Sequence, residues 1–325
     1  MTQHRVRIYQ QGGPSVMRYE PLPVTIGLPG RGQVRLRHDA IGLNFVDTMF
    51  RDGTFSVPLP FDMGVEGAGV VEAVAAGLES VKAGDRVAYF FTPGAYADIR
   101  LIDAAVLVKL PDDVSTELAA ALLTKGLTAW MLIKRAHVVR PGETVLVHGA
   151  AGGVGSLVSR WAKALGAIVI ATVGSPAKAA GVRSQGIEHV LESDDPDLVT
   201  KVRAITEGRG VDAVYEFVGK ATFRQSVLAL RDGGDMVHVG NASGSPAADD
   251  KSPLAARSIR YIQPTTSQYV NDRAALNEAS SDLFAAYRAG VLGEIEPTRY
   301  ALADAARAHA DIASRKITGS AILIP

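Results

Sequence analysis

The stretch Val145-Leu-Val-His-Gly-Ala-Ala-Gly-Gly-Val-Gly155 decides how this sequence is interpreted. An apolar run precedes a set of spaced glycines, and a helical pattern begins immediately after them. Gly149 would let a buried strand turn, Gly152 would let the backbone approach a pyrophosphate, and Gly155 would let the next helix press against the sheet. The N-terminus of that helix would offer N–H groups and a partial positive charge to phosphate. The stretch therefore predicts a dinucleotide-binding turn.

Apolar strands and helical patterns alternate around this turn, from about residue 144 to residue 239. Strands buried on both faces and separated by helices are typical of an α/β fold with a doubly wound parallel sheet of the Rossmann type. We expect strands at 145–148, 168–173, 189–191, 212–217 and 235–239, and helices at 154–165, from about 177, at 197–206 and at 223–230.

The segments on either side differ from this pattern. Residues 6–108 contain short apolar runs interrupted by glycine, proline and aspartate, which predicts a compact β-barrel-like unit. After a loop at 241–253, the sequence predicts helices at 273–289 and 299–314 and a strand at 320–324. We expect this tail to pack on the first segment, because it is too small to form a core alone. The predicted segments are residues 1–125, 126–263 and 264–325, the first and last forming one domain.

The composition is that of a globular protein. The 325 residues include 34 basic and 34 acidic side chains, and this balance argues against nucleic acid as a main partner. No cysteine is present, which excludes disulfides, thiolate nucleophiles and cysteine-ligated metals. The first residues lack the apolar segment of a signal peptide, and no run approaches about 18 uninterrupted apolar residues. We therefore expect no membrane span and a cytoplasmic location.

The end of the second predicted strand indicates which dinucleotide binds. Enzymes that use NAD usually place Asp or Glu there, about 20 residues after the turn, to bind the ribose hydroxyls. Here the strand ends in Ala171-Thr-Val-Gly-Ser-Pro-Ala-Lys178, without a carboxylate. Beside Gly174, Ser175 can donate a hydrogen bond to a 2′-phosphate and Lys178 can pair with its charge. The sequence favours NADPH over NADH, with a solvated surface role as the alternative for Lys178.

Four stretches in a fixed order carry a resemblance to a known family: 12–14, 40–48, 64–71, and 125–128 followed by the glycine turn. The whole chain resembles the zinc-free quinone oxidoreductase (zeta-crystallin-like) branch of the medium-chain dehydrogenase/reductase superfamily. The resemblance implies a GroES-like β-barrel catalytic domain, NADPH as cofactor, a quinone as substrate, and a homodimer. The dimer would join sheets through an edge strand, near Tyr261 or at Asp235–Val239.

The residues that hold catalytic zinc in other members of this superfamily are replaced. Those members have a ligand cysteine near position 44 and a ligand histidine in the stretch that matches 64–67, where this chain has Asn44 and Val65. A catalytic zinc needs about three protein ligands at one open site, so we expect no metal. The predicted chemistry is hydride delivery from NADPH to an acceptor that is already electrophilic, either a quinone or an α,β-unsaturated carbonyl.

The resemblance also nominates site residues. The candidate catalytic residues are Asn44, Asp47 and Thr128, although Asn44 could instead form a local turn and Asp47 a helix cap. The implied cofactor contacts are Asn44, Thr128, Gly149, Ala151, Gly152, Gly153, Val154, Gly155, Gly174, Ser175, Lys178, Ser193, Val218, Val239, Gly240, Asn241 and Arg315. Ser193 stands where relatives often have a tyrosine that helps to bind the 2′-phosphate. His148 is interpreted as structural.

Two other functions are compatible with these residues. One is an NADPH-dependent enone or alkenal double-bond reductase, which would prefer enones over quinones. The other is a non-catalytic NADPH- and RNA-binding protein of the zeta-crystallin type, against which the neutral charge balance argues mildly.

Overall fold

The computed structural model describes residues 2–23 and 26–325. It divides into unit 1, Met1–Thr124 with Ile295–Pro325, and unit 2, Lys125–Glu294. The chain therefore returns to unit 1 at Ile295, whereas the sequence had placed this return at residue 264. The reason is that α10 (Arg273–Arg288) pairs with α2 (Thr116–Met131): Trp130 Nε1 donates to Asp282 Oδ2 at 2.9 Å, and an added Cβ at Gly126 would lie 2.4 Å from the Leu283 side chain.

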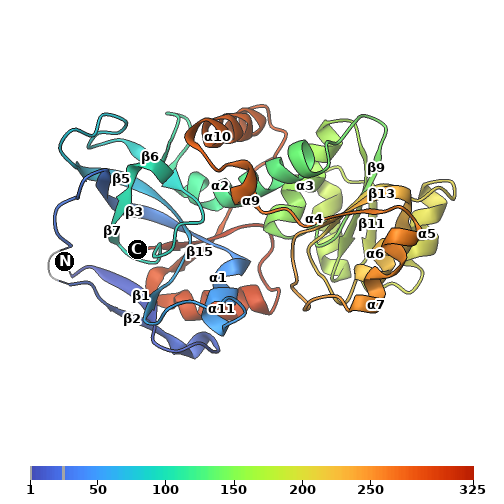
Figure 1. Cartoon of the computed structure of the whole chain (residues 1–325), viewed down its shortest axis with the longest axis horizontal. Coiled ribbons are helices and arrows are strands. Elements are labelled where there is room, and N and C mark those ends of the chain that lie inside the picture. The colour runs from blue at the N-terminus through green and yellow to red at the C-terminus, as the bar shows by residue number, and fades with distance from the viewer. Residues whose placement is uncertain (1, 24–25) are drawn as a thin grey trace. The chain divides into compact units, whose positions relative to one another are not determined.

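Unit 2 contains a six-stranded parallel sheet in the order β11-β10-β9-β12-β13-β14 (Figure 1). This is the 3-2-1-4-5-6 order of a doubly wound Rossmann fold, which confirms the predicted fold class. The strands are β9 (Thr144–Val147), β10 (Ile168–Val173), β11 (His189–Glu192), β12 (Val211–Glu216), β13 (Leu230–His238) and β14 (Arg260–Ile262). The predicted edge strand at Asp235–Val239 is wrong, because β13 lies between β12 and β14; the alternative near Tyr261 falls on the edge strand β14.

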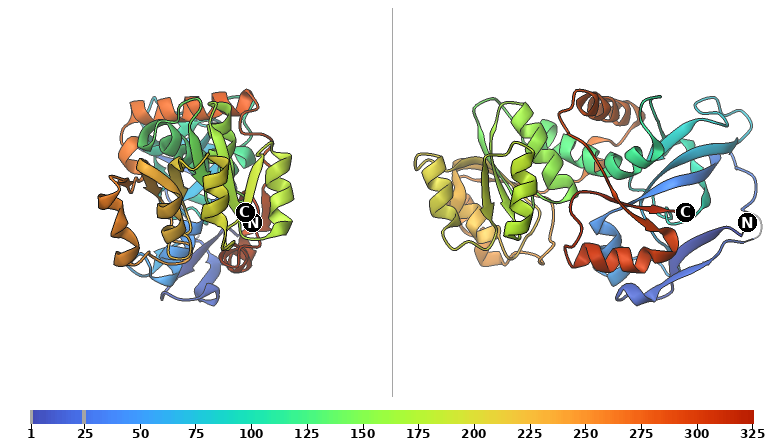
Figure 2. Two further views of the ribbon diagram at one scale, coloured as in Figure 1. Left: turned by 90° about the vertical axis from the view of Figure 1, so that its right-hand side faces the viewer. Right: turned by 180° about the vertical axis from the view of Figure 1, so that it is seen from behind.

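Helices lie on both sides of this sheet, as the end-on and rear views of Figure 2 show. On one face, a buried cluster joins Leu146, Ile170 and Met236 of the strands to Val202, Phe223 and Leu254 of the helices. The helices are α3 (Gly153–Ala164), α4 (Pro176–Ser184), α5 (Leu198–Ile205), α6 (Phe223–Ala229), α7 (Ala248–Lys251), α8 (Pro253–Ala256), α9 (Thr266–Tyr269) and α10. Local sequence patterns missed α7, α8 and α9, which are four residues long; the three-residue strand β14 was expected only from the resemblance, as an edge strand near Tyr261.

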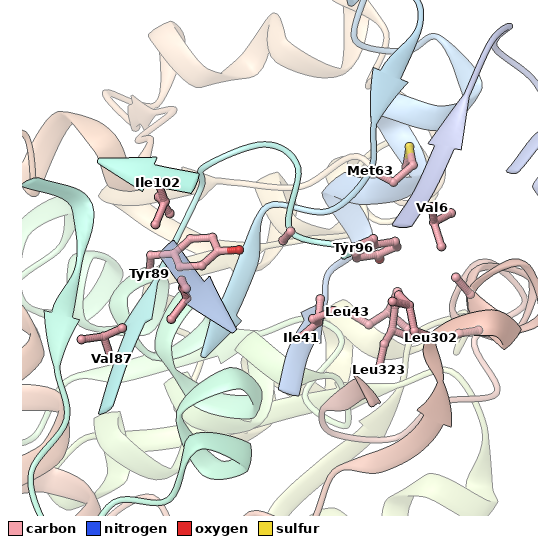
Figure 3. Close-up of a cluster of buried hydrophobic side chains, with 14 of the residues drawn as sticks. Val6, Ile41, Leu43, Met63, Val87, Tyr89, Tyr96, Ile102, Leu302 and Leu323 are labelled. Carbon is pink, nitrogen blue, oxygen red and sulfur yellow. The ribbon is translucent and has the colours of Figure 1, made fainter. Parts of the chain in front are cut away.

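Unit 1 contains the predicted β-rich domain. A seven-stranded sheet has the order β15-β16-β3-β5-β6-β8, with β7 paired to β3, and a three-stranded sheet has the order β2-β1-β4. Their buried side chains form one core, in which Val6, Ile41, Tyr96 and Leu323 are seen in Figure 3. The strands are β1 (His4–Ile8), β2 (Met17–Pro21), β3 (Gln33–Leu43), β4 (Phe61–Asp62), β5 (Glu66–Val74), β6 (Arg86–Tyr89), β7 (Ile99–Asp103), β8 (Val108–Lys109), β15 (Thr298–Ala301) and β16 (Ala321–Ile324).

Among its described residues, unit 1 also contains the helices α1 (Phe45–Asp52) and α11 (Ala305–Ala313), the first part of α2, and the 3-10 segments η1 (Pro14–Val16), η2 (Ala104–Val106) and η4 (Leu302–Asp304). The predicted helix at 299–314 is wrong at its start. Residues Thr298–Ala301 form β15, which pairs in parallel with β16, and this long-range pairing overrides the helical pattern of the sequence.

Helix α2 continues into a π-helical segment, Leu132–Ala136. The combined helix Thr116–Ala136 is long and apolar enough to cross a membrane, although charged residues such as Glu117 and Lys125 interrupt its apolar run. However, 72% of its most apolar window is buried inside the protein. We therefore assign this helix to the protein core.

Candidate active site

The glycine turn of unit 2 has the geometry that its sequence predicts. Gly149 has a φ of +61°, and Gly152 is the N-cap of α3. An added Cβ at Gly155 would lie 2.4 Å from the carbonyl oxygen of Gly149, so a side chain is excluded there. The backbone that approaches Gly155 most closely is thus that of the glycine turn, whereas we had expected it to be that of the sheet. These contacts hold the first turn of α3 against the end of β9.

Three further residues complete this turn. Ala151 is buried, and Gly153 and Val154 begin α3, so their backbone N–H groups belong to the helix N-terminus. The Ala150 N–H donates to the Thr172 carbonyl at 3.0 Å, which ties the turn to β10. A helix N-terminus with glycine at its cap and first residue fits a pyrophosphate.

The end of β10 holds the residues predicted to select the dinucleotide. Ser175 is the N-cap of α4, and the Lys178 N–H donates to the Ser175 carbonyl at 3.1 Å. Gly174, immediately before them, is exposed. These three residues therefore lie at the start of one helix, with Gly174 before the cap, Ser175 at the cap and Lys178 in the first turn.

Ser193, which follows β11, bonds back to β10. Its hydroxyl lies 3.0 Å from the Val173 carbonyl oxygen and 3.2 Å from Thr172 Oγ1. The side chain is half-buried. Its hydrogen-bonding capacity is used within the fold, which gives little support to the 2′-phosphate role that the resemblance implied.

Two loops meet where β12 and β13 end, and they contain four of the predicted cofactor contacts. The N–H groups of Val239 and Gly240 donate to the Glu216 carbonyl at 2.9 and 3.2 Å, and the Val218 carbonyl accepts the Ser243 N–H at 2.8 Å. Asn241 Oδ1 lies 3.0 Å from His238 Nε2. The carboxyl ends of parallel strands are where such sheets bind their ligands.

Glu216 is a site residue that sequence reasoning missed. It is fully buried at the end of β12, and its carboxylate accepts the N–H groups of Val218 at 2.8 Å and Gly219 at 3.0 Å. Burial acts to raise the pKa of Glu216, but His148, the Ser226 hydroxyl and the two N–H groups outweigh it, so the pKa is lowered overall. The only sequence signal was a carboxylate at the last position of a buried strand.

In unit 1, Asn44 is the N-cap of α1 and forms a capping box with Asp47. The Asn44 N–H donates to Asp47 Oδ2 at 2.8 Å, and Asn44 Nδ2 donates to Glu66 Oε2 at 2.8 Å. Glu66 also accepts the Thr124 N–H at 2.7 Å, and an added Cβ at Gly42 would lie 2.1 Å from its carboxylate. The predicted capping role of Asp47 is thus present, and the amide of Asn44 has a fixed orientation.

A second buried hydrogen-bond network ends on the Asp47 carboxylate. It consists of Arg51, His309, Tyr96 and Asp47, and we call it the His309 network. Arg51 Nη1 lies 3.2 Å from His309 Nδ1, and Tyr96 Oη lies 3.0 Å from both His309 Nε2 and Asp47 Oδ2. Because arginine only donates, His309 Nδ1 accepts and its Nε2–H donates to Tyr96, whose hydroxyl donates to Asp47. Burial, aided by Arg51, lowers the pKa of His309 to about 3, so the ring is neutral.

The remaining predicted residues lie in different surroundings. Thr128 is in α2, with its hydroxyl 3.1 Å from that of Thr266 in unit 2. Arg315 is exposed in unit 1, just after α11, with a φ of +59°. His148 is fully buried and hydrogen-bonded at both ring nitrogens, as a structural histidine should be.

The positions of the zinc ligands hold side chains that do not fit zinc. Asn44 bonds to Glu66, and Val65 is a fully buried apolar side chain. Across residues 2–23 and 26–325, no group of three or more His, Asp or Glu side chains is arranged to hold a metal ion.

Comparison with known proteins identifies the family. Residues 30–112 match the alcohol dehydrogenase GroES-like domain, and residues 153–281 match the zinc-binding dehydrogenase family. The chain is 39% identical to a quinone oxidoreductase of Pseudomonas aeruginosa, over 99% of each chain. It is 40% identical to a 2-haloacrylate reductase of a Burkholderia species, over 98% of each chain.

A solved structure supports the same assignment. The quinone oxidoreductase of Escherichia coli, determined in complex with NADPH, superimposes with a TM-score of 0.94 at 38% identity, over 99% of this chain and 100% of that one. The chain therefore belongs to the quinone oxidoreductase branch of the medium-chain dehydrogenase/reductase superfamily.

Proposed function

We propose that this chain is an NADPH-dependent, zinc-independent quinone reductase. The observation that carries the proposal is the pairing of the glycine turn with the Gly174–Lys178 segment, where Ser175 and Lys178 share one helix N-terminus and no carboxylate ends β10. Family membership and the NADPH complex of the Escherichia coli relative support it.

Each part of the site has a task in this proposal. When bound, NADPH supplies the hydride, and the overall reaction converts quinone, NADPH and a proton into hydroquinone and NADP⁺. The N-terminus of α3 binds the pyrophosphate, and Ser175 and Lys178 bind the 2′-phosphate. In unit 1, Asn44, oriented by Glu66 and Asp47, would hydrogen-bond the acceptor; in unit 2, the loops at Val218 and Gly240 would line the nicotinamide.

Reduction of an activated carbon–carbon double bond is the second candidate. The relative named 2-haloacrylate reductase, 40% identical over 98% of this chain, favours it specifically. The same hydride donor and the same absence of zinc ligands serve both reactions, because conjugation stabilises the anion that hydride addition creates.

We also propose a homodimer joined through β14. This strand is at the edge of the six-stranded sheet, and an edge strand offers backbone groups to a second copy. A sedimentation measurement should give twice the mass of the 34.2 kDa chain. A monomeric mass would rule the dimer out.

An acceptor panel tests the catalytic proposal. Purified protein should oxidise NADPH saturably with 1,4-benzoquinone and 9,10-phenanthrenequinone, and more slowly with 2-cyclohexen-1-one and 2-chloroacrylate. A higher kcat/KM with the last two acceptors would favour the double-bond reductase. If NADPH binds and none of the four acceptors is turned over, both proposals fail.

A variant pair tests the cofactor assignment. Lys178→Ala should raise the KM for NADPH about tenfold, because one charge-assisted contact to the 2′-phosphate is lost, and leave the KM for NADH unchanged. Lys201→Ala is the matched control, since Lys201 is a half-exposed lysine of the same unit that pairs with Asp195. Equal changes in the KM for NADPH and for NADH would show that Lys178 does not contact the 2′-phosphate.

A further inference from the structure

Five buried or half-buried side chains form a continuous hydrogen-bonded row beneath the glycine turn: Ser193, Thr172, His148, Ser226 and Glu216, which we call the His148 network. We propose that this network is a positioning device that fixes the loop Phe217–Gly219, and through it the nicotinamide end of the cofactor site. The proposal rests on the proposed function for what the loop touches.

The hydrogen bonds of this network run in one direction. Ser226 Oγ lies 2.6 Å from Glu216 Oε2, and a carboxylate only accepts, so the serine hydroxyl donates to it. Ser226 Oγ must then accept from His148 Nε2, 2.9 Å away, which places the ring proton on Nε2. His148 Nδ1 therefore accepts from the Thr172 hydroxyl at 2.9 Å, and Thr172 Oγ1 can accept from Ser193 at 3.2 Å.

This arrangement needs a neutral histidine, and its surroundings supply one. His148 is fully buried, and burial lowers its pKa although the Glu216 carboxylate, 3.7 Å away, opposes this. A neutral ring has one donor and one acceptor nitrogen, which is what a one-directional row requires.

The network fixes the position of two backbone N–H groups. Glu216 Oε1 accepts from Val218 N at 2.8 Å, Gly219 N at 3.0 Å and the Thr222 hydroxyl at 2.8 Å. The Val218 carbonyl in turn accepts the Ser243 N–H and hydroxyl, which carries the restraint to the loop after β13. Gly219 has a φ of +88°, and an added Cβ would lie 2.4 Å from the Gly244 carbonyl oxygen, so the two loops fit closely.

The network is also placed to connect the two ends of the cofactor site. It connects β10, the end of β9, α6 and β12, in that order along the row. His148 directly precedes Gly149. Ser193 and Thr172 lie near the segment proposed to bind the 2′-phosphate, while Glu216 lies at the nicotinamide loops. Removing the Thr172 hydroxyl would leave His148 Nδ1 without its donor, so the ring would lose one of the two hydrogen bonds that hold it against Ser226.

Two substitutions test this inference. Thr172→Val preserves shape and removes one hydroxyl, and Ser226→Ala removes the next. Each should lower kcat for quinone reduction about tenfold through misplacement of the nicotinamide loop, while the Kd of 2′,5′-ADP, which probes only the adenosine end, stays within twofold. The double variant should be no worse than the poorer single variant, because both break the same row.

Ser280→Ala is the matched control. Ser280 is a buried helix serine of unit 2 whose hydroxyl lies within hydrogen-bond distance of the carbonyl four residues earlier, as that of Ser226 does, and it lies outside the network. It should lower Tm as much as Ser226→Ala and leave kcat unchanged. If the two serine variants change kcat equally, or if Thr172→Val leaves kcat unchanged, the network is merely structural and the proposal fails.

A spectroscopic readout separates this inference from the catalytic proposal. ¹⁵N NMR of labelled protein should show His148 as the Nε2–H tautomer, and Thr172→Val should keep this tautomer and shift the Nδ1 resonance toward that of a nitrogen that accepts no hydrogen bond. Each variant should also weaken NADPH binding more than 2′,5′-ADP binding. These results can hold even if no quinone is turned over; an Nδ1–H tautomer in the unmodified protein would overturn the network by itself.

Discussion

The His309 network of unit 1 and the His148 network of unit 2 share a plan and differ in one respect. Each has a buried neutral histidine and, at one end, a buried carboxylate that accepts backbone N–H groups: that of Asn44 in unit 1, and those of Val218 and Gly219 in unit 2. The opposite ends differ: the His309 network begins at the buried guanidinium of Arg51, and the His148 network begins at the half-buried hydroxyl of Ser193.

This difference has an energetic consequence. A buried charged donor leaves several polar groups unsatisfied when it is removed, whereas a half-buried hydroxyl can be replaced by water. The His309 network should therefore dominate stability, and the His148 network should affect mainly the geometry of the site.

The largest expected effect comes from Gly64→Ala. Gly64 has a φ of +84°, and an added Cβ would lie 2.0 Å from the Tyr96 ring, so the substitution displaces the central link of the His309 network. We expect a loss of about 3–5 kcal/mol in the free energy of unfolding of unit 1, measured by calorimetry. Gly84→Ala is the control, with a φ of +90° and open space among the described residues, and it should cost only about 1 kcal/mol. Equal losses would show that the Tyr96 contact is unimportant.

Arg51→Met should have the next largest effect. It removes the donors to His309 Nδ1 and to the Gly12 carbonyl, which Arg51 Nε contacts at 3.0 Å. Denaturant unfolding followed by circular dichroism should show a loss of about 3 kcal/mol. Arg35→Met, which breaks the partly exposed pair with Glu72, should cost less than about 1 kcal/mol. A loss for Arg51→Met as small as that would refute the ranking of the two networks.

The pH dependence of the free energy of unfolding should reveal the contribution of His309. Its pKa is about 3 in the folded protein and about 6.5 when unfolded, so its contribution is complete above pH 6.5 and is lost as the pH falls toward 3. The expected slope is about 1.4 kcal/mol per pH unit for this histidine, and buried His38, whose pKa is also about 3, adds to it.

Unfolding of His309→Gln between pH 6.5 and 4 should therefore show a smaller slope than the unmodified protein. Asp235→Asn is the comparison: Arg260 and His137 overcome the effect of burial and lower the pKa of Asp235 to about 2, so its contribution is lost only below about pH 3.8. An unchanged slope in His309→Gln would mean that this histidine is protonated in the folded state.

Ser193→Ala should have the smallest effect. The Ser193 hydroxyl is half-buried and also reaches the Val173 carbonyl, so we expect a stability loss below about 1 kcal/mol. The Kd of 2′,5′-ADP, measured calorimetrically, should change less than with Lys178→Ala. A larger rise in Kd for Ser193→Ala would restore the phosphate role that the resemblance first implied.

The parts of the fold that could be predicted from sequence are those that local patterns determine. The glycine turn and the long apolar strands of unit 2 carry their own periodicity, so β9 and β10 were placed within a residue. Strand β15 could not be predicted, because its identity depends on pairing with β16, more than 20 residues later. The short strand β14 depends in the same way on β13.

The site follows the same rule. Asn44 and Asp47 were nominated because they lie in a stretch that carries the family resemblance, and the hydrogen bond between them is local. Tyr96 and His309 were missed because the hydrogen bond between them joins positions 213 residues apart. Glu66 and Glu216 were missed because the partners of a strand carboxylate appear only in the folded protein.

The central claim is that this chain passes hydride from NADPH to a quinone with its own side chains and no zinc. The most direct measurement is NADPH oxidation with 1,4-benzoquinone by protein dialysed against a chelator and verified metal-free, with the rate without enzyme subtracted. We predict an undiminished rate and one hydroquinone formed for each NADPH consumed. Loss of activity that only added zinc restores, or NADPH consumption without hydroquinone, would contradict the account.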